Sequence, residues 1–328
     1  MIRWGILGTA KIAREHLVPA MHAANNSVLQ AVASRTQESA TKFAEQFNIP
    51  HACSSYETLL SRDDIDVVYI PLPTSAHIEW ARKALEAGKN VLVEKPLALN
   101  AKEILPLIEL RDQTGLLATE AFMVTFHPQW IKVKELIASG AIGKLRHVQG
   151  AFSYHLVDPD NMRNKLSLGG GGLPDIGVYP TVATRFVTGI EPQRARATIE
   201  YDSTFGTDIF ASCCLDFDDF TLNFYCATQL AQRQNMVFHG DEGWIDVNAP
   251  FNAELYDSVD VTLNSQNYGT GQTWRYQKVN QYKLQIEAIA NKLRGEDVEL
   301  FTLEQSLANQ MAIDALYASD KSGTWIEL

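Results

Sequence analysis

Two short stretches of the sequence carry side chains that could exchange a proton with a substrate hydroxyl. One is Glu94-Lys95-Pro96, and the other is Asp175-Ile176-Gly177-Val178-Tyr179. An isolated tyrosine has a pKa near ~10, so bringing a phenol toward neutrality takes roughly 4 kcal/mol. A lysine ammonium in a partly dry cleft supplies energy of that order, because it stabilises the phenolate. Lys95 and Tyr179 are therefore the predicted acid–base pair, with Asp175 beside them.

The predicted elements place these residues where ligands bind. Lys95 follows a buried strand at 91–93, at the carboxyl end of a parallel sheet. Asp175 and Tyr179 are spaced i, i+4 and share one face of a helix expected from about 174 to 187. Simpler interpretations remain open, since the lysine could be a surface residue and the aspartate a helix cap beside a buried tyrosine. Two further residues could line a substrate pocket or be structural: His127 and Arg163.

The first predicted strand, 2–7, ends in a turn typical of dinucleotide sites. The segment Gly8-Thr9-Ala10-Lys11-Ile12-Ala13 is a variant of the glycine fingerprint in which alanine replaces the second and third glycines. Small residues there let the backbone approach a pyrophosphate, which binds at the N-terminus of the next helix, expected over 12–24. An ordinary tight turn is the alternative, but the strand before it and the helix after it favour a cofactor.

The end of the second strand favours NADP over NAD. A carboxylate that would bind ribose hydroxyls is expected about 20 residues past the last small residue of the fingerprint, and Ser34 stands there, followed by Arg35. Arg35 could bind a 2′-phosphate with roughly 1.5–3 kcal/mol of charge-assisted hydrogen bonding, or it could be a solvated loop charge. The remaining predicted cofactor contacts follow later strands: Leu72, Pro73, Thr74, His77 and Glu94, together with Lys95. His77 could equally be structural.

The composition limits the classes of protein to consider. The 328 residues favour two domains, and 46% hydrophobic residues allow a large buried core. Acidic residues exceed basic ones, 39 against 28, which argues against a nucleic-acid surface. No segment approaches ~20 continuous apolar residues, so no membrane span is expected. The N-terminus starts directly in a strand without a signal peptide, and the four cysteines lack metal-ligand spacing, so a cytoplasmic protein without a metal site is expected.

The order of predicted elements indicates an α/β fold with two domains. In domain 1–121, apolar runs alternate with helices, which indicates a doubly wound parallel sheet of the Rossmann type. Pro106 predicts a kink or a late start in the helix after residue 100. Domain 122–328 has longer, alternating strands that suit an open, mainly antiparallel sheet with one face covered. The predicted strands there are 146–153, 194–201, 208–215, 221–226, 236–240 and 244–247, and the predicted helices are 128–139, 174–187, 281–293 and 303–317.

These motifs together resemble those of the Gfo/Idh/MocA oxidoreductases. The similar segments span the chain: Trp4-Gly5-Ile6-Leu7-Gly8-Thr9-Ala10, Glu94-Lys95-Pro96, Glu120-Ala121-Phe122-Met123, Phe126-His127-Pro128-Gln129, and Gly170-Gly171-Gly172 running into Asp175-Ile176-Gly177-Val178-Tyr179. The resemblance is greatest to the branch with dimeric dihydrodiol dehydrogenase, NADP-dependent D-xylose 1-dehydrogenase and glucose–fructose oxidoreductase. It implies a Rossmann domain followed by an α/β domain whose open sheet commonly forms the subunit interface.

The resemblance also implies roles for individual residues. Lys95 matches the catalytic lysine, and Asp175 matches an aspartate that binds a substrate hydroxyl or holds the site. Tyr179 stands where the inositol dehydrogenases have histidine. One departure is Thr74, where relatives usually carry asparagine, and another is the lack of the long N-terminal arm that buries cofactor in glucose–fructose oxidoreductase.

The function implied by the resemblance is an NADP-dependent oxidoreductase. It would transfer hydride between nicotinamide and the carbinol of a sugar or cyclic polyol, of the aldose or trans-dihydrodiol type, in either direction. The expected assembly is a homodimer or homotetramer through the C-terminal sheet, without nucleic-acid or membrane partners. Two alternatives stay open: a non-catalytic NADP-responsive regulator of the same fold, and a transhydrogenase with tightly bound NADP. Substrate specificity is expected from the segments 155–167 and 267–276.

Overall fold

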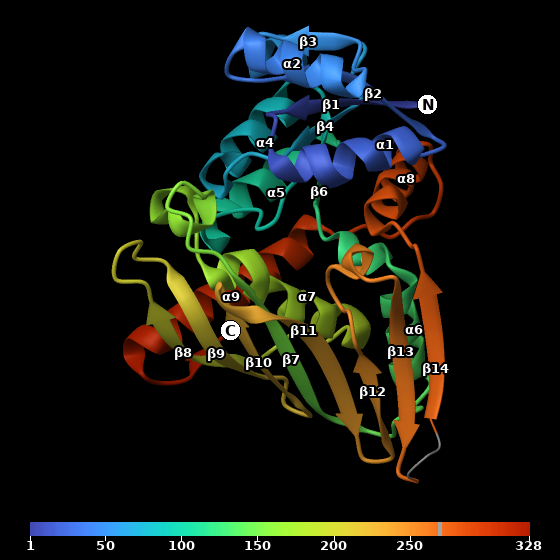
Figure 1. The fold of residues 1–328 in the computed structure, drawn as a ribbon, viewed down its shortest axis with the longest axis vertical. Helices are drawn as coiled ribbons and strands as arrows, with labels where there is room; N and C mark the ends of the chain where they lie inside the picture. The colour runs from blue at the N-terminus through green and yellow to red at the C-terminus, as the bar shows by residue number, and fades with distance from the viewer. Residues whose placement is uncertain (268–270) are drawn as a thin grey trace. The chain divides into compact units, whose positions relative to one another are not determined.

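The computed structural model describes residues 1–267 and 271–328 and divides them into two compact units (Figure 1). The first unit comprises Met1–Met123 and Asn280–Leu307, and the second comprises Val124–Val279 and Ala308–Leu328. The sequence placed a single boundary after residue 121, whereas the structure packs Asn280–Leu307 with the first unit.

The first unit is built on a parallel sheet with the strand order β3-β2-β1-β4-β5-β6. This is the strand order of a doubly wound Rossmann sheet. Successive strands are added on one side of β1 up to β3 and on its other side from β4 onward. Because helices cover such a sheet on both faces, its strands are almost continuously apolar, and Val67–Ile70 is wholly buried. The strands are β1 (Ile2–Leu7), β2 (Ser27–Ala33), β3 (His51–Cys53), β4 (Val67–Ile70), β5 (Asn90–Val93) and β6 (Ala118–Glu120).

The helices of the first unit follow the predicted pattern with one local difference. The helix expected over 12–24 contains a π-helical turn at Ala13–Leu17 before α1 (Val18–Ala23). The helix after residue 100 starts late, as predicted, because Pro106 lies in the first turn of α5. This helix, α5, spans Leu105–Thr114. The other helices are α2 (Gln37–Phe47), α3 (Tyr56–Leu60), α4 (His77–Glu86) and α8 (Gln281–Leu293).

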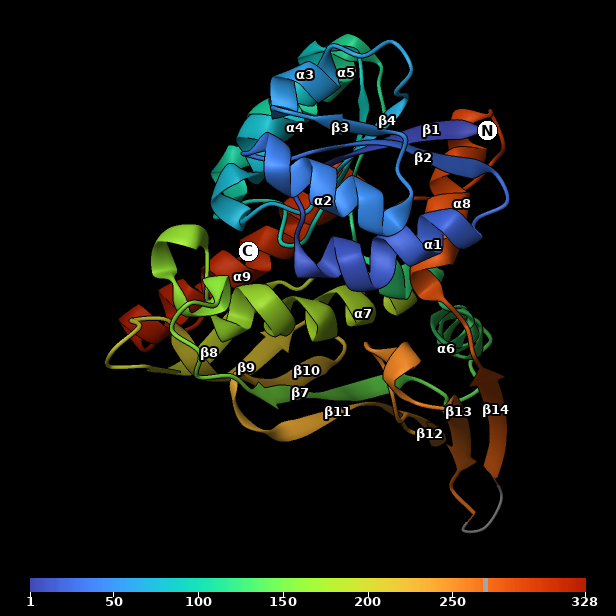
Figure 2. The ribbon, with the colours of Figure 1, turned by 45° about the horizontal axis from the view of Figure 1, so that its top comes forward.

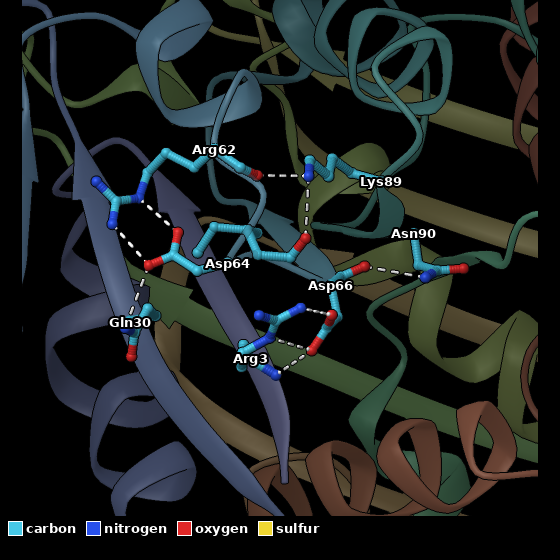
Figure 3. Close-up of polar contacts among 8 residues, drawn as sticks. Arg3, Gln30, Arg62, Asp64, Asp66, Lys89 and Asn90 are labelled. Atoms are coloured by element: carbon cyan, nitrogen blue, oxygen red, sulfur yellow. Dashed lines mark hydrogen bonds and ion pairs between the residues drawn. The ribbon is translucent and has the colours of Figure 1, made fainter.

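A polar network ties together the amino ends of the parallel strands (Figure 3). The guanidinium of Arg3 in β1 pairs with Asp66, which directly precedes β4, at 2.5 and 3.0 Å. The ammonium of Lys89, 7% exposed, donates to the carbonyls of Arg62 (2.6 Å) and Ile65 (3.1 Å). These contacts lie at the opposite end of the strands from the predicted cofactor residues, so they hold the sheet rather than a ligand.

The second unit contains, within the described residues, a sheet in the order β14-β13-β12-β11-β7-β10-β9-β8-β15. Only β7 and β10 pair in parallel in this part of the chain, so the predicted mainly antiparallel sheet is confirmed. The strands are β7 (Leu145–His155), β8 (Arg194–Tyr201), β9 (Asp208–Asp216), β10 (Thr221–Ala227), β11 (Gln229–Gly240), β12 (Gly243–Val247), β13 (Ser258–Ser265), β14 (Gly271–Gln277) and β15 (Ile326–Glu327).

Helices cover one face of this sheet. Figure 2 shows α7 (Val178–Thr188) lying across β7, and a Cβ added to Gly150 of β7 would lie 3.2 Å from Pro180 of α7. The helix expected over 174–187 thus exists, but its first part, Leu173–Gly177, is a π-helical turn. The remaining helices are α6 (Pro128–Ala138) and α9 (Leu303–Ser322), whose residues from Ala308 onward belong to this unit.

Short 3-10 helices connect several of these elements: Thr74–Ala76, Ala101–Glu103, Met123–Phe126, Met162–Asn164, Leu166–Leu168 and Ala253–Leu255. Of the segment 267–276 that was expected to form a specificity loop, 268–270 lie outside the described residues. Residues Gly271–Gln277 form β14 instead of a loop.

Candidate active site

The turn after β1 has the backbone shape that a dinucleotide site needs. Gly8 has a φ of +102°, and its N–H donates to the carbonyl of Ala33 at the end of β2 (2.7 Å). A Cβ at Gly8 would lie 3.1 Å from Cδ2 of Leu72, so only glycine keeps this space open. The helical segment begins at Lys11, which places its unpaired N–H groups at the turn. These features fit a pyrophosphate-binding turn.

The other predicted residues of this turn are accessible. The side chain of Lys11 is 79% exposed and lies 3.8 Å from Glu15. A contact between side-chain hydroxyls, 3.3 Å long, joins Thr9 to Ser39 in the first turn of α2. This contact links the turn to the start of α2. Three residues of the turn are partly exposed: Thr9, Ala10 and Ile12.

The residues after β2 fit a phosphate better than a ribose diol. Ser34 is buried and Arg35 is exposed, and no carboxylate stands between Ala33 and the helix cap Thr36. Sequence reasoning missed Tyr56, whose hydroxyl would lie 3.8 Å from a Cβ at Gly8. Burial raises the pKa of Tyr56, and the nearby charge of Arg35 opposes that shift. Tyr56 thus lies close to both the glycine turn and the predicted phosphate ligand.

The loop after β4 and the start of α4 carry four of the predicted cofactor residues. Leu72 and Pro73 are partly exposed, and Thr74 is buried at the start of the following 3-10 helix. His77 is 1% exposed, with Nδ1 2.8 Å from the carbonyl of Pro96 and Nε2 2.7 Å from that of Leu72. Burial lowers its pKa to about 4. Each ring nitrogen faces a main-chain carbonyl, and a neutral ring can donate to only one of them, so neither nitrogen is left for a cofactor.

The turn that carries Lys95 is fixed by side chains from the neighbouring strands. The hydroxyl of Tyr69 in β4 donates to Oε1 of Glu94 (2.6 Å), and the N–H of Lys95 donates to Oε2 of the same residue (3.2 Å). The peptide bond between Lys95 and Pro96 is cis. On the other side, Glu120 at the end of β6 accepts the N–H of Leu97 (2.8 Å). The backbone on either side of Lys95 is therefore held before any ligand binds.

In the second unit, Asp175 is the centre of a compact polar cluster. Its Oδ2 accepts the hydroxyl of Tyr154 (2.5 Å) and Nε of Arg163 (2.8 Å). The carboxylate raises the pKa of Arg163, and burial, with Asp175 next in importance, raises the pKa of Tyr154. The structure thus brings the predicted residues Asp175 and Arg163 together. It adds Tyr154 of β7, which no sequence motif indicated.

Tyr179 lies in the first turn of α7 and is 5% exposed. Its ring packs against Phe152 at 5.6 Å and Phe251 at 5.4 Å between centroids. It also lies close enough to Arg163 to contribute to the raised pKa of that guanidinium. The phenol therefore lies near the guanidinium that pairs with Asp175.

His127, predicted to line the substrate pocket, is the N-cap of α6. It is 1% exposed, its Nδ1 accepts the N–H of Gln129 (3.1 Å), and its ring meets Tyr276 edge-on at 6.0 Å. Burial lowers the pKa of His127 to about 4. The residue is thus a neutral helix cap at neutral pH, which leaves only Nε2 for a substrate.

Comparisons with known proteins identify the family. Residues 2–122 match the Gfo/Idh/MocA family described as an oxidoreductase family with an NAD-binding Rossmann fold, and residues 130–246 match the Gfo/Idh/MocA C-terminal domain. The chain belongs to the Gfo/Idh/MocA family of oxidoreductases. The family resemblance and the fold class predicted from the sequence are thereby confirmed.

Relatives of this Gfo/Idh/MocA chain include enzymes of sugar metabolism. It is 38% identical to an uncharacterized oxidoreductase of Rhizobium meliloti, over 99% of this chain and 98% of that one. It is 32% identical to a D-xylose 1-dehydrogenase (NADP(+)) of Haloferax volcanii, over 99% of both chains. The crystal structure of KijD10, a 3-ketoreductase from Actinomadura kijaniata, in complex with NADP and TDP-benzene, covers 97% of both chains with 29% identity and a TM-score of 0.89.

Within residues 1–267 and 271–328, no group of three or more His, Cys, Asp and Glu side chains is arranged to hold a metal ion. None of the helices in the described part of the chain is both long enough and apolar enough to span a bilayer.

Proposed function

We propose that this oxidoreductase uses NADP and acts on the carbinol carbon of a sugar or cyclic polyol. The observation that carries the proposal is the position of Lys95 and Gly8 at the carboxyl edge of one parallel sheet, after β5 and β1. In doubly wound folds this edge is where the dinucleotide binds. We assign cofactor binding to the first unit and substrate binding to the second.

The preference for NADP rests on the residues after β2. Arg35 is exposed at the start of α2, and Ser34 replaces the carboxylate that would repel a 2′-phosphate. Tyr56 lies beside this surface. The relatives agree with this assignment, since one is named as an NADP(+) enzyme and KijD10 was solved with NADP.

The chemistry would be divided between two side chains. Tyr179 accepts the proton of the substrate hydroxyl in oxidation and returns it in reduction. Lys95, in the first unit, would supply the positive charge that favours an ionised oxygen. Asp175, held by Tyr154 and Arg163, orients a neighbouring hydroxyl. When bound, nicotinamide supplies the hydride acceptor or donor.

The proposed substrate class is supported by the relatives and by the cluster of hydrogen-bonding groups around Asp175. One relative is named for D-xylose and the other was solved as a 3-ketoreductase with a TDP ligand, so both free aldoses and nucleotide-linked keto sugars belong in a substrate panel. The same site can run in either direction.

The test measures NADPH formation by the purified protein with aldoses, cyclic polyols and trans-dihydrodiols, and NADPH consumption with keto sugars and dicarbonyls. We expect turnover with at least one sugar-like compound and a higher efficiency with NADP than with NAD. A protein that binds NADP but turns over nothing would instead be a regulator. Nucleotide absorbance that stays with the protein through purification would indicate a transhydrogenase.

We further propose that the uncovered face of the large sheet joins subunits into a homodimer or homotetramer. This face has a hollow of about 480 Å³ lined mainly by polar side chains, including Gln149, Arg196, Asn223 and Arg233. Light scattering should give a mass of two or four chains, and a monomeric mass at micromolar concentration contradicts the assignment.

A further inference from the structure

A buried carboxylate outside the predicted site holds the start of the helical segment that carries Asp175 and Tyr179. It belongs to Asp208, the first residue of β9, which is 2% exposed. Its Oδ2 accepts the N–H of Leu173 (2.6 Å), and the carboxylate also bonds the N–H of Gly172. A carboxylate on the first N–H groups of a helix satisfies donors that have no partner within the helix and favours the helix dipole.

The glycine turn before the helix is shaped around this carboxylate. A Cβ at Gly171, which has a φ of +140°, would lie 2.0 Å from Oδ1 of Asp208. A Cβ at Gly170 would lie 2.4 Å from the carbonyl oxygen of Arg163. The turn thus packs tightly against the Asp208 carboxylate on one side and against the backbone of Arg163 on the other. Only glycine fits at these two positions, which accounts for the run of glycines noted in the sequence.

The other oxygen of the Asp208 carboxylate has a partner in α9. The hydroxyl of Tyr317 in α9 donates to Oδ1 of Asp208 (2.6 Å). Burial raises the pKa of the Asp208 carboxyl, and the bonds from Tyr317 and the backbone oppose that shift. Without the Tyr317 hydroxyl, the ionised form of Asp208 would be less stable, and its carboxylate would be less firmly oriented toward the helix.

We propose that Asp208 and Tyr317 are positioning residues that fix the orientation of Asp175 and Tyr179 through the backbone N–H groups at the helix start. This inference rests on the proposed function, since Tyr179 is the assumed proton acceptor. Asp175 follows Leu173 by two residues, and Tyr179 follows by six, so a shift of the first turn moves both. A displacement of about 1 Å at a reacting group costs on the order of 100-fold in rate.

The experiment compares three variants of the full-length enzyme. Tyr317→Phe keeps the ring and removes one hydrogen bond, and Asp208→Asn keeps the shape and removes the charge. The matched control is Tyr201→Phe, because Tyr201 of β8 donates to Asp320 of α9 (3.2 Å), which is also a phenol–carboxylate bond between the sheet and α9. We expect kcat to fall roughly 10- to 100-fold in the first two variants, with an unchanged KM for NADP, and to stay within about twofold in the control.

A second measurement does not depend on turnover. Hydrogen exchange at the amides of Gly172 and Leu173 should be faster in Tyr317→Phe and Asp208→Asn than in the wild type and in Tyr201→Phe. Faster exchange in a protein that turns over no substrate supports the positioning and refutes only the proposed function. Wild-type exchange and wild-type kcat in Tyr317→Phe overturn the inference. A loss of kcat that follows thermal stability equally in all three variants overturns it as well.

Discussion

Glu120→Gln should make the protein more stable at neutral and alkaline pH. The Glu120 carboxyl is 3% exposed, and burial raises its pKa from 4.5 to about 7, while bonds from Ser306 and the N–H of Leu97 oppose the shift. A carboxyl that binds its proton more tightly when folded stabilises the protein below its unfolded pKa, and that stability is lost as pH rises through the folded pKa. For this pKa difference the loss between pH ~5 and pH ~8 is on the order of 2–3 kcal/mol.

Urea unfolding at these two pH values measures the effect. Glutamine keeps an oxygen that can accept the N–H of Leu97 but has no charge to bury, so the variant should lack this part of the pH dependence. The stability of Glu120→Gln relative to the wild type should therefore rise by roughly 2–3 kcal/mol from pH ~5 to pH ~8. The control is Glu109→Gln, an exposed glutamate in α5, whose stability relative to the wild type should be the same at both pH values.

Two results would refute this reasoning. If Glu120→Gln differs from the wild type by the same free energy at both pH values, the carboxyl does not titrate between them. If the variant loses stability relative to the wild type as pH rises, ionised Glu120 is better solvated when folded than its burial indicates. Glu120 would then act as an ordinary carboxylate beside the Lys95 turn.

Three further predictions concern the proposed reaction. Lys95→Ala should lower turnover at least ~100-fold while NADP affinity, measured by fluorescence titration, stays near that of the wild type; a folded variant with normal turnover would remove Lys95 from the mechanism. Arg35→Ala should reduce the preference for NADP over NAD in kcat/KM by about tenfold or more, and equal efficiencies with both cofactors in the wild type would contradict the phosphate contact. Tyr179→Phe should lose most activity together with the rise in oxidation rate as pH increases, and a variant with the wild-type rate and pH profile would make Tyr179 structural.

The fold of the first unit could be predicted because its strands are short apolar runs bounded by glycine, proline and helix caps. β1 has the predicted bounds, and α4 ends before Gly88, which adopts a φ of +76°. The π-helical turn at Ala13–Leu17 could not be predicted. It differs from an α-helix by one hydrogen-bond step, and no residue type marks that step.

The edge of the second sheet was missed for a physical reason. β14, Gly271–Gln277, contains no buried residue and pairs on one side only with β13. Trp274 and Tyr276 are partly buried and alternate with exposed residues, but two such positions are too few to distinguish a strand from a loop. The segment was therefore interpreted as a loop, although Trp274 and Tyr276 favour a strand.

The candidate site divides into residues that motifs reveal and residues that only packing reveals. Gly8 and Lys95 stand at the ends of predicted strands, so their place at the sheet edge could be inferred. Tyr56, Tyr154 and Asp208 come from elements far away in the sequence, and no spacing relates them to the motifs. Residues that support a site are recognised through hydrogen bonds, and these depend on tertiary structure.

Three buried titratable groups make stability depend on pH in opposite directions. Burial lowers the pKa of His77 and of His127 to about 4, so the stability that the neutral rings provide is lost as pH falls from the unfolded value through the folded one. Glu120 has the opposite effect, since its contribution is lost as pH rises toward 7 and beyond. Because two histidines oppose one glutamate, the summed contribution of these groups falls below pH ~6 and changes little from pH ~6.5 upward. The proposed oxidation through Tyr179 would be favoured in alkaline solution, because the phenol must give up or share its proton. In that range the stability lost at Glu120 is offset by the stability that the two neutral histidines provide, so these groups together do not oppose the proposed oxidation.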